Sequence, residues 1–278
     1  MARVAITGAS GQVGRLLAAK LKEAEIETTP LGRRDDWGAG IAGADAVAAL
    51  AGTLQPHRGD DYRSANTETA GRTAAAVREA GAGRIVFLSY VGAAMDSPNA
   101  YLRSKAEAEA LLIESGVPTT IFRCLHIYGP PQHPGPTAAA FIAAPGRAVT
   151  VPGDGTQRIA PLYLGDAVAA LFGALTHPDA PTGIFELGGP EEMTLDDFVR
   201  ALNGGVVKLR HLPAPIARLA ARISPSLTPA LIDLLLRDNT VAGDPAEVGS
   251  RFGFTPHRLA DVWGSRPEGS APGPRRGG

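Results

Sequence analysis

Tyr101 and Lys105 have the residue types and the spacing of a proton-transfer pair. Two residues four apart lie on the same face of a helix, one turn from each other. The turn and cap residues at 97–99, Ser-Pro-Asn, predict that such a helix begins directly before Tyr101. A phenol with an ordinary pKa of about 10 is a poor base at neutral pH, but a nearby ammonium group stabilises the phenolate and lowers that pKa. The pair therefore predicts general acid/base chemistry on an alcohol or a ketone, with an exposed surface pair as the alternative.

Ser89 adds a hydroxyl group at a position where a ligand is expected. It ends the apolar run of residues 84–89, which we predict to be a strand. The carboxyl ends of parallel strands line the ligand crevice of an open α/β sheet. We therefore expect Ser89 to hold a substrate oxygen near Tyr101.

Three glycines, Gly8, Gly11 and Gly14, lie between the first predicted strand and the first predicted helix. Gly8 permits a tight turn, Gly11 lets backbone amides approach a pyrophosphate, and Gly14 lets the helix pack closely on the sheet. The amides and the positive dipole end of the helix then stabilise the phosphates. An ordinary glycine turn is the alternative, but the flanking strand and helix favour a dinucleotide site.

The second predicted strand ends in Arg33 and Arg34 rather than in an acidic residue. An acid at this position binds the ribose hydroxyls of NAD, whereas an arginine accommodates the 2′-phosphate of NADP. The two arginines therefore favour NADP(H) as the cofactor. NAD(H) is the alternative, because the arginines could be solvated and paired with Asp35 and Asp36, which could also bind ribose hydroxyls.

Short apolar runs alternate with helix-period segments through the first half of the chain, which is the pattern of βαβ units around a parallel sheet. This pattern predicts an α/β fold, a Rossmann-type doubly wound parallel sheet with helices on both faces and a smaller C-terminal substrate-binding region. Residues 12–24 form the first predicted helix, with Val13, Leu16, Leu17, Leu21 and Ala24 on its apolar face. The predicted strands are Val4–Thr7, Glu27–Leu31, Ala46–Leu50, Arg84–Ser89 and Thr119–Arg123.

The chain is expected to divide into an NAD(P)-binding Rossmann domain, residues 1–150, and a smaller substrate-binding region, residues 151–264, which partly returns to the sheet. Residues 35–44 are too few for a further strand with its own helices, so we expect this edge of the sheet to lack that strand and its helices. Residues 265–278 hold no large apolar residue, so we expect a disordered tail. Helical stretches in the later half are predicted at 195–202, 216–223 and 229–236.

The composition excludes several classes of function. The formal net charge is −1, with 27 basic and 28 acidic residues, so no positive field is available to bind nucleic acid or an anionic membrane. A single cysteine, Cys124, and the lack of clustered Cys and His predict neither a disulfide framework nor a metal site. No apolar stretch is long enough to span a bilayer, and the first apolar run leaves no room for a leader sequence. We therefore expect a cytoplasmic monomer or homodimer that acts on a small molecule.

The glycine loop, the strand-end serine and the Tyr-x-x-x-Lys motif together resemble the short-chain dehydrogenase/reductase superfamily. Later segments resemble its extended and atypical members, which include the epimerase/dehydratase group and the NAD(P)-binding relatives of the complex I assembly subunit. The motifs occur in the same order over residues 2–263. These later segments are Phe122–Pro130, Val151–Arg158, Tyr163–Val168 and Glu186–Pro190.

The resemblance implies a role for each matching residue. Tyr101 would be the catalytic acid/base, Lys105 would bind the nicotinamide ribose and lower the pKa of Tyr101, and Ser89 would orient the reacting oxygen. Two features depart from the pattern. Tyr90 stands where many members have a second small residue, and it is a substrate-binding candidate. The segment 35–44 is short, which weakens the case for assigning the family's adenine contacts to residues of this chain. The residues implied to bind the cofactor, besides Arg33, Arg34, Tyr101 and Lys105, are Gly8, Ser10, Gly11, Gln12, Val13, Ala51 and Gly52.

Three residues of the later half are further candidates for substrate binding, each with a structural alternative. His126 follows the strand over residues 119–123, where an imidazole could polarise or protonate a substrate, and a loop histidine bound to backbone carbonyls is the alternative. Arg158 resembles a residue that contacts a nucleotide phosphate in sugar-nucleotide enzymes, and a structural salt bridge explains it equally well. Tyr163 either contacts substrate or belongs to the core.

Three hypotheses of function follow. The first is an NADP(H)-dependent oxidoreductase that transfers hydride between nicotinamide and a carbonyl or alcohol of a small or medium organic substrate. The second is an epimerase, dehydratase or cyclase that uses the bound cofactor without net redox change, and net consumption of NADPH separates these two. The third is a non-catalytic sensor or assembly protein, against which the joint presence of Ser89, Tyr101 and Lys105 argues.

Overall fold

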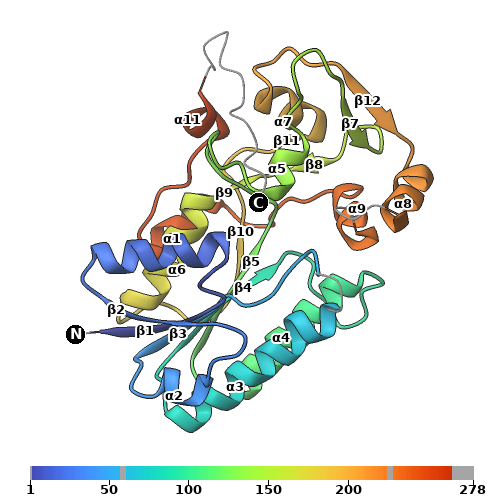
Figure 1. The fold of residues 1–278 in the computed structure, drawn as a ribbon. Helices are drawn as coiled ribbons and strands as arrows, with labels where there is room; N and C mark the ends of the chain where they lie inside the picture. Colours follow the sequence, from blue (N-terminus) through green and yellow to red (C-terminus); the bar gives the residue numbers. More distant parts are fainter. Residues whose placement is uncertain (1, 57–60, 224–227, 265–278) are drawn as a thin grey trace. The chain divides into compact units, whose positions relative to one another are not determined.

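A parallel sheet is the central element of the computed structural model, which describes residues 2–56, 61–223 and 228–264 (Figure 1). Its six strands are β1 (Arg3–Thr7), β2 (Glu27–Leu31), β3 (Ala46–Ala49), β4 (Ile85–Tyr90), β5 (Thr119–Cys124) and β10 (Gly183–Leu187). They lie in the order β10-β5-β4-β3-β1-β2, and every neighbouring pair is parallel. This arrangement, with helices on the sheet, confirms the predicted Rossmann-type α/β fold.

The strands follow the distribution of apolar residues. The five strands expected from the sequence are present, each within one residue of its expected ends. All four residues of β3 are buried, as expected for a strand covered on both faces. In contrast, β2 is an edge strand with more exposed residues, and it contains Pro30, which has no N–H to donate to a second neighbour.

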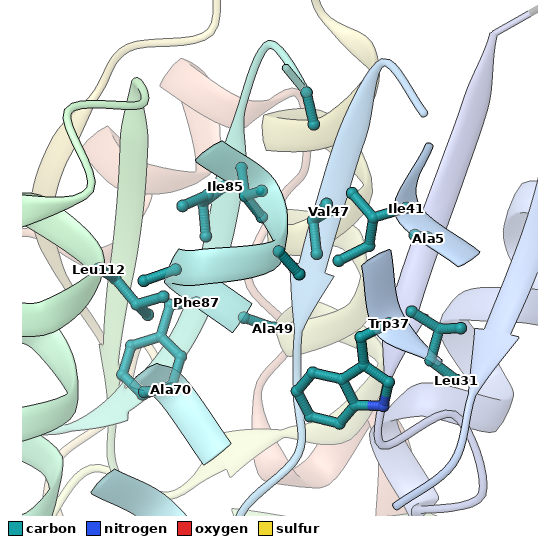
Figure 2. Close-up of a cluster of buried hydrophobic side chains, with 14 of the residues drawn as sticks. Ala5, Leu31, Trp37, Ile41, Val47, Ala49, Ala70, Ile85, Phe87 and Leu112 are labelled. Carbon is teal, nitrogen blue, oxygen red and sulfur yellow. The ribbon is translucent and has the colours of Figure 1, made fainter. Parts of the chain in front are cut away.

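Helices α2 (Trp37–Ile41), α3 (Glu68–Ala80) and α4 (Ala100–Glu114) cover one face of the sheet (Figure 1). Figure 2 shows the buried cluster between these helices and the strands. The short helix α2 is the one helix between β2 and β3, so the segment 35–44 contributes a single helical turn and no strand. The cluster includes Ala5, Leu31, Val47, Ile85 and Phe87 from the strands and Trp37, Ile41, Ala70, Val77 and Leu112 from the helices.

Helices α1 (Gln12–Glu23), α6 (Leu164–Thr176) and α10 (Pro245–Phe252) pack on the other face. Nζ of Lys20 on α1 lies 5.1 Å from the centre of the Phe172 ring on α6. The ring centre of Phe252, at the end of α10, lies 4.7 Å from that of Phe122 and 5.1 Å from that of Phe185. Phe122 and Phe185 are register partners on β5 and β10, so the end of α10 packs against both strands.

Two residues of the predicted apolar face of α1 are exposed. Leu16 is 45% exposed, and Ala24, which follows the last residue of the helix, is exposed as well, whereas Leu17 and Leu21 are fully buried. The buried face of this helix is therefore narrower than the sequence predicted, because Gly14 rather than a large side chain forms its first buried position.

The chain divides into two compact units that interleave along the sequence. The first contains the sheet and its helices, and comprises residues 1–125, 165–188 and 241–256. The domain boundary expected at residue 150 stays a prediction, and the tail 265–278 lies outside the described residues. The described elements of the second unit are β6 (Ile127–Tyr128), α5 (Pro136–Ala140), β7 (Val149–Pro152), β8 (Arg158–Ile159), β9 (Leu162–Tyr163), β11 (Met193–Thr194), α7 (Leu195–Leu202), β12 (Leu209–Leu212), α8 (Ala214–Ile223), α9 (Pro229–Leu235) and α11 (Leu259–Trp263).

The second unit contains short paired strands rather than an extended sheet. Its pairs are β6 with β9, β7 with β12 and β8 with β11. The helical stretches expected at 195–202, 216–223 and 229–236 are present as α7, α8 and α9.

Candidate active site and dinucleotide pocket

The glycine loop joins β1 to α1, and two of its glycines are required by the backbone itself. Gly8 has a φ of +71°, and a Cβ atom there would lie 2.7 Å from the backbone nitrogen of Ala51. A Cβ atom on Gly14 would lie 2.5 Å from the carbonyl oxygen of Gly8. The close approach at Gly14 is thus between the first turn of α1 and the loop, whereas the sequence predicted an approach of helix to sheet.

A pocket of about 330 Å³ opens beside this loop. Gly11 is the N-cap residue of helix α1 and has no side chain to cap the first turn, and that turn carries no acidic residue. The positive end of the helix dipole is therefore available to an anion, as a pyrophosphate requires. The lining of this pocket includes Gly8, Ser10, Gly11, Arg33, Ala51, Gly52, Thr69 and Arg72.

Gly11→Val is expected to abolish dinucleotide binding while the protein stays folded. A Cβ atom at this position would lie 3.2 Å from the carbonyl oxygen of Gly8, and the branched side chain would occupy space beside the α1 amides. Calorimetric titration with NADPH measures affinity, and circular dichroism measures folding. Gly243→Val is the control, because a Cβ atom there meets no heavy atom within 4 Å. Normal affinity in a folded Gly11→Val protein would show that the loop does not hold the phosphates.

One distant side chain and two local ones hold the segment after β2. Arg72 on α3 donates hydrogen bonds to the carbonyl oxygens of Arg33, at 2.9 Å, and Asp35, at 3.3 Å. The Asp35 carboxylate accepts from the backbone N–H of Gly32 at 2.6 Å. The indole N–H of Trp37 donates to the carbonyl oxygen of Gly32 at 2.8 Å. Arg72 was not predicted, because nothing in its neighbourhood along the chain indicates a contact with the segment after β2.

The two arginines after β2 have different surroundings. Arg33 lines the pocket, whereas Arg34 is not among the residues that line it. The carboxylate of Asp36 caps α2 by accepting from the backbone N–H of Ala39. The structure therefore brings one of the two predicted arginines to the glycine-loop pocket.

Tyr101 lies in the first turn of α4, as the sequence predicted. The side chain of Asn99 caps this helix and accepts from the backbone N–H of Tyr101 at 3.0 Å. The Tyr101 ring lies edge-on to the rings of Tyr62 and Tyr90, with ring centres 5.8 Å and 5.6 Å away. Burial raises the pKa of Tyr101 above its ordinary value, and Cys124 and Tyr62 raise it further. The phenol is therefore protonated at neutral pH, whereas the sequence predicted a lowered pKa.

Lys105 is buried one turn further along α4. Its Nζ donates to the carbonyl oxygen of Leu88 at 2.6 Å and lies 4.1 Å from the centre of the Phe87 ring. Burial lowers the pKa of Lys105 to about 8, while the carboxylate of Glu109 acts in the opposite direction. The ammonium group is thus directed toward the end of β4, and the pKa of Tyr101 is set by burial rather than by this cation.

The hydroxyl of Ser89 belongs to a buried polar cluster that connects β4, β5 and α4. It donates a hydrogen bond to the Glu109 carboxylate, which also accepts three hydrogen bonds from Arg123, at 2.6, 3.0 and 3.2 Å. Ser89 and Arg123 are register partners on neighbouring strands, and Glu109 is 3% exposed. Sequence analysis missed this cluster, although the spacing of four between Lys105 and Glu109 placed both side chains on one helix face.

A second polar network connects the pocket loop to α4. Asn66 lies in the π-helical turn η1 (Arg63–Thr67) and is buried. Its Oδ1 accepts from the backbone N–H of Thr53 at 2.8 Å, and its Nδ2 donates to Oγ of Ser104 at 3.0 Å. Thr53 follows the pocket residues Ala51 and Gly52, so Asn66 connects this loop with the helix that carries Tyr101.

Two of the substrate candidates, His126 and Tyr163, are packed inside the second compact unit. Burial and the positive charge of Arg237 lower the pKa of His126 to about 4, so its imidazole is neutral at neutral pH. The ring centre of Tyr163 lies 5.8 Å from that of Tyr128 and 5.3 Å from that of His257. The substrate roles of both residues stay predictions.

Arg158 forms a salt bridge with Glu192, also in the second unit. The shortest distance between the guanidinium and the carboxylate is 2.8 Å, and both side chains are partly exposed. This is the structural alternative that the sequence left open, and contact with a substrate phosphate stays a prediction.

The described part of the chain contains no group of three or more His, Cys, Asp and Glu side chains that could hold a metal ion. Among its helices, none is both long enough and apolar enough to cross a membrane. A cytoplasmic location and a monomeric or homodimeric state stay predictions.

Two curated proteins are similar to this chain in sequence. It is 27% identical over 237 residues to NADH dehydrogenase (ubiquinone) 1 alpha subcomplex subunit 9, mitochondrial, of Arabidopsis thaliana, a match that covers 79% of this chain and 59% of that protein. It is 34% identical over 136 residues to a UDP-2-acetamido-2,6-beta-L-arabino-hexul-4-ose reductase of Pseudomonas aeruginosa, covering 46% of this chain and 36% of that protein. The chain therefore spans less than two thirds of the length of either relative.

Solved structures share the fold over most of the chain. MoeE5 in complex with UDP-glucose and NAD has a TM-score of 0.72 and 21% identity, with 94% of this chain and 97% of that chain covered. The UDP-glucuronic acid 4-epimerase of Bacillus cereus, in complex with UDP-glucuronic acid and NAD, has a TM-score of 0.68 and 17% identity, with 94% and 96% covered. Residues 4–188 match the family described as NAD dependent epimerase/dehydratase family. Because this match extends over more than half of the sequence, the chain belongs to that family, within the short-chain dehydrogenase/reductase superfamily.

Proposed function

We propose that the protein is an NADP(H)-dependent oxidoreductase that interconverts a carbonyl and an alcohol of a small or medium organic substrate. The observation that carries this proposal is Tyr101, a buried protonated phenol one helical turn from Lys105, in the same compact unit as the glycine-loop pocket. A bound nicotinamide would supply or accept the hydride. The proposed pyrophosphate ligands are Gly8, Ser10, Gly11, Gln12 and Val13, with Ala51 and Gly52 beside the cofactor.

Tyr101 is the proposed general acid. In the direction of reduction, its hydroxyl donates a proton to the substrate oxygen as the carbonyl carbon receives hydride. The raised pKa keeps that proton on Tyr101 at neutral pH. In the direction of oxidation the same group would have to be a phenolate, which burial disfavours. Proton donation in the direction of reduction leaves the same phenolate, so burial of Tyr101 supports its role as the acid but does not select the direction of the reaction.

Lys105 and Ser89 support this chemistry in different ways. Lys105 is proposed to bind the nicotinamide ribose, and it can do so while bound to Leu88, because an ammonium group has three donors. The hydroxyl proton of Ser89 is already donated to Glu109, so this hydroxyl can accept a further hydrogen bond but cannot donate one. Its role in orienting the reacting oxygen stays a prediction.

NADPH is expected to bind more tightly than NADH. Arg33 lines the pocket, and a charge-assisted pair between a guanidinium and a 2′-phosphate is worth roughly tenfold to a hundredfold in affinity. Arg33→Ala should therefore remove most of the preference, as titration calorimetry with both dinucleotides would measure. Arg34→Ala is the matched control, because Arg34 does not line the pocket. Equal affinity of the unaltered protein for the two dinucleotides would contradict the preference.

An epimerase or dehydratase without net redox change is the second candidate. It is supported by the family description and by the solved structure of a UDP-glucuronic acid 4-epimerase with a similar fold. Incubation with NADPH and a panel of ketones, aldehydes and sugar nucleotides separates the two candidates. Stoichiometric oxidation of NADPH supports the reductase, whereas a new product without loss of NADPH supports the second candidate.

A sensor or assembly role, which the likeness to a subunit of NADH dehydrogenase suggests, predicts dinucleotide binding without any product.

A further inference from the structure

Arg72 is a second guanidinium at the β2 end of the glycine-loop pocket. Its side chain extends from α3 and bridges the carbonyl oxygens of Arg33 and Asp35, at 2.9 and 3.3 Å. Its guanidinium carbon lies 4.0 Å from the centre of the Trp37 ring. Two carbonyl groups and an aromatic ring therefore fix the position of this cation in the segment where the cofactor's selectivity is expected to lie.

The contacts of Arg72 fix the position of its guanidinium group but do not neutralise its positive charge. Carbonyl oxygens and an indole ring are uncharged partners, and among the described residues no carboxylate forms an ion pair with Arg72. A guanidinium has five N–H donors, so donors remain for a ligand. Because the planar group is already oriented, less side-chain entropy is lost when it binds an anion.

The charges around Arg72 are separated into two pockets. In the described part of the chain, the charged residues that line the glycine-loop pocket are Arg33 and Arg72, and no carboxylate lines it. The carboxylate residues Asp35, Asp36 and Glu79 line a neighbouring pocket, which shares Trp37 and Arg72 with the first. The contacting pair of Trp37 and Arg72 thus lines both the neighbouring pocket, which has carboxylates, and the glycine-loop pocket, which has none. The glycine-loop pocket suits a ligand with a further phosphate at this end.

We infer that Arg72 acts together with Arg33 to give selectivity for the 2′-phosphate of NADP(H), an inference that rests on the proposed function. Arg72 pairs with the phosphate inside the pocket, and its hydrogen bonds to the carbonyls of Arg33 and Asp35 keep the segment that carries Arg33 in place. A neutral ribose 2′-hydroxyl gains little from a second cation, so the effect falls on NADPH rather than on NADH.

The test measures four affinities by calorimetry, for NADPH, NADH, adenosine 2′,5′-bisphosphate and adenosine 5′-monophosphate. Arg72→Met is expected to weaken binding of the two ligands with a 2′-phosphate by roughly tenfold to a hundredfold, and to change the other two only slightly. Arg78→Met is the matched control, because Arg78 is exposed on the same helix and does not line the pocket. It should leave all four affinities unchanged.

Two outcomes would overturn the inference. Equal losses for NADPH and NADH would show that Arg72 only supports the shape of the loop, and an NADPH preference that survives Arg72→Met would show that it has no part in selectivity. If Arg72→Met does not fold, Arg72→Gln carries the same test, since glutamine is neutral but can still donate to a carbonyl. An unaltered protein that binds neither dinucleotide contradicts the proposed function itself, whereas the first two outcomes leave it standing.

Discussion

Tyr101→Phe is expected to lower kcat by roughly 10²–10⁴-fold while dinucleotide affinity stays unchanged. The substitution removes only the hydroxyl that would carry the proton to the substrate oxygen. The edge-on packing of the ring with Tyr62 and Tyr90 is retained, so the fold should not suffer. Steady-state kinetics on a substrate from the carbonyl screen, together with calorimetric titration of NADPH, measures both quantities.

Two further variants show whether the effect belongs to the proton of Tyr101. Tyr62→Phe removes a hydroxyl from the neighbouring ring, where it donates to the carbonyl oxygen of Leu54, and turnover should be nearly unchanged. Lys105→Ala should weaken dinucleotide binding as well as turnover, because it removes the proposed ribose contact. Unchanged turnover in Tyr101→Phe would transfer the role of the acid to another group, with His126 the first candidate.

Glu109→Ala is expected to lower the free energy of unfolding by about 3–5 kcal/mol. It removes the acceptor of the Ser89 hydroxyl and leaves Arg123, whose side chain is 24% exposed, without its partner. A charge that loses its hydrogen-bonded partner in a largely buried position is left with less compensation, which here comes from the attraction of the Glu186 carboxylate. Denaturation by urea, followed by circular dichroism, measures the difference.

The double variant Glu109→Leu with Arg123→Met separates the pair from general damage to α4. Removing both charges should recover most of the stability, because a buried ion pair is often replaceable by apolar side chains. Glu114→Ala, at the exposed end of the same helix, is the control and should have little effect. A loss for Glu109→Ala no larger than that for Glu114→Ala would show that the Ser89, Glu109 and Arg123 cluster does not stabilise the fold.

The strands near the start of the chain could be predicted because their signals are local. An apolar run followed by a glycine turn and an amphipathic segment specifies β1, the loop and α1 within a short stretch of sequence. The residues of the edge strand β10 were not predicted to form a strand, and the sequence indicated only that the region 151–264 partly returns to the sheet. This strand pairs with β5, from which it is distant in sequence, and such pairing depends on which strand edge is left open by the rest of the fold.

The candidate site divides in the same way between local and distant features. The helix that carries Tyr101 and Lys105 was predicted from its cap, and Asn99 caps it as expected. The partners of these residues were not predicted, because Tyr62 and Leu88 reach them from other elements. No pattern of spacing along one helix reveals what packs against it.

The sequence by itself determined the first five strands of the sheet, the glycine loop and the pairing of a phenol with an ammonium group on one helix face, because turns, caps and helix faces depend on residues a few positions apart. Only the tertiary structure decided how these groups are used. It directs the hydroxyl of Ser89 to Glu109, and it brings Arg72 to Arg33 across 39 positions of the chain. It also raises the pKa of Tyr101, since that pKa follows from burial, and burial is a property of the packed molecule rather than of the spacing between two residues.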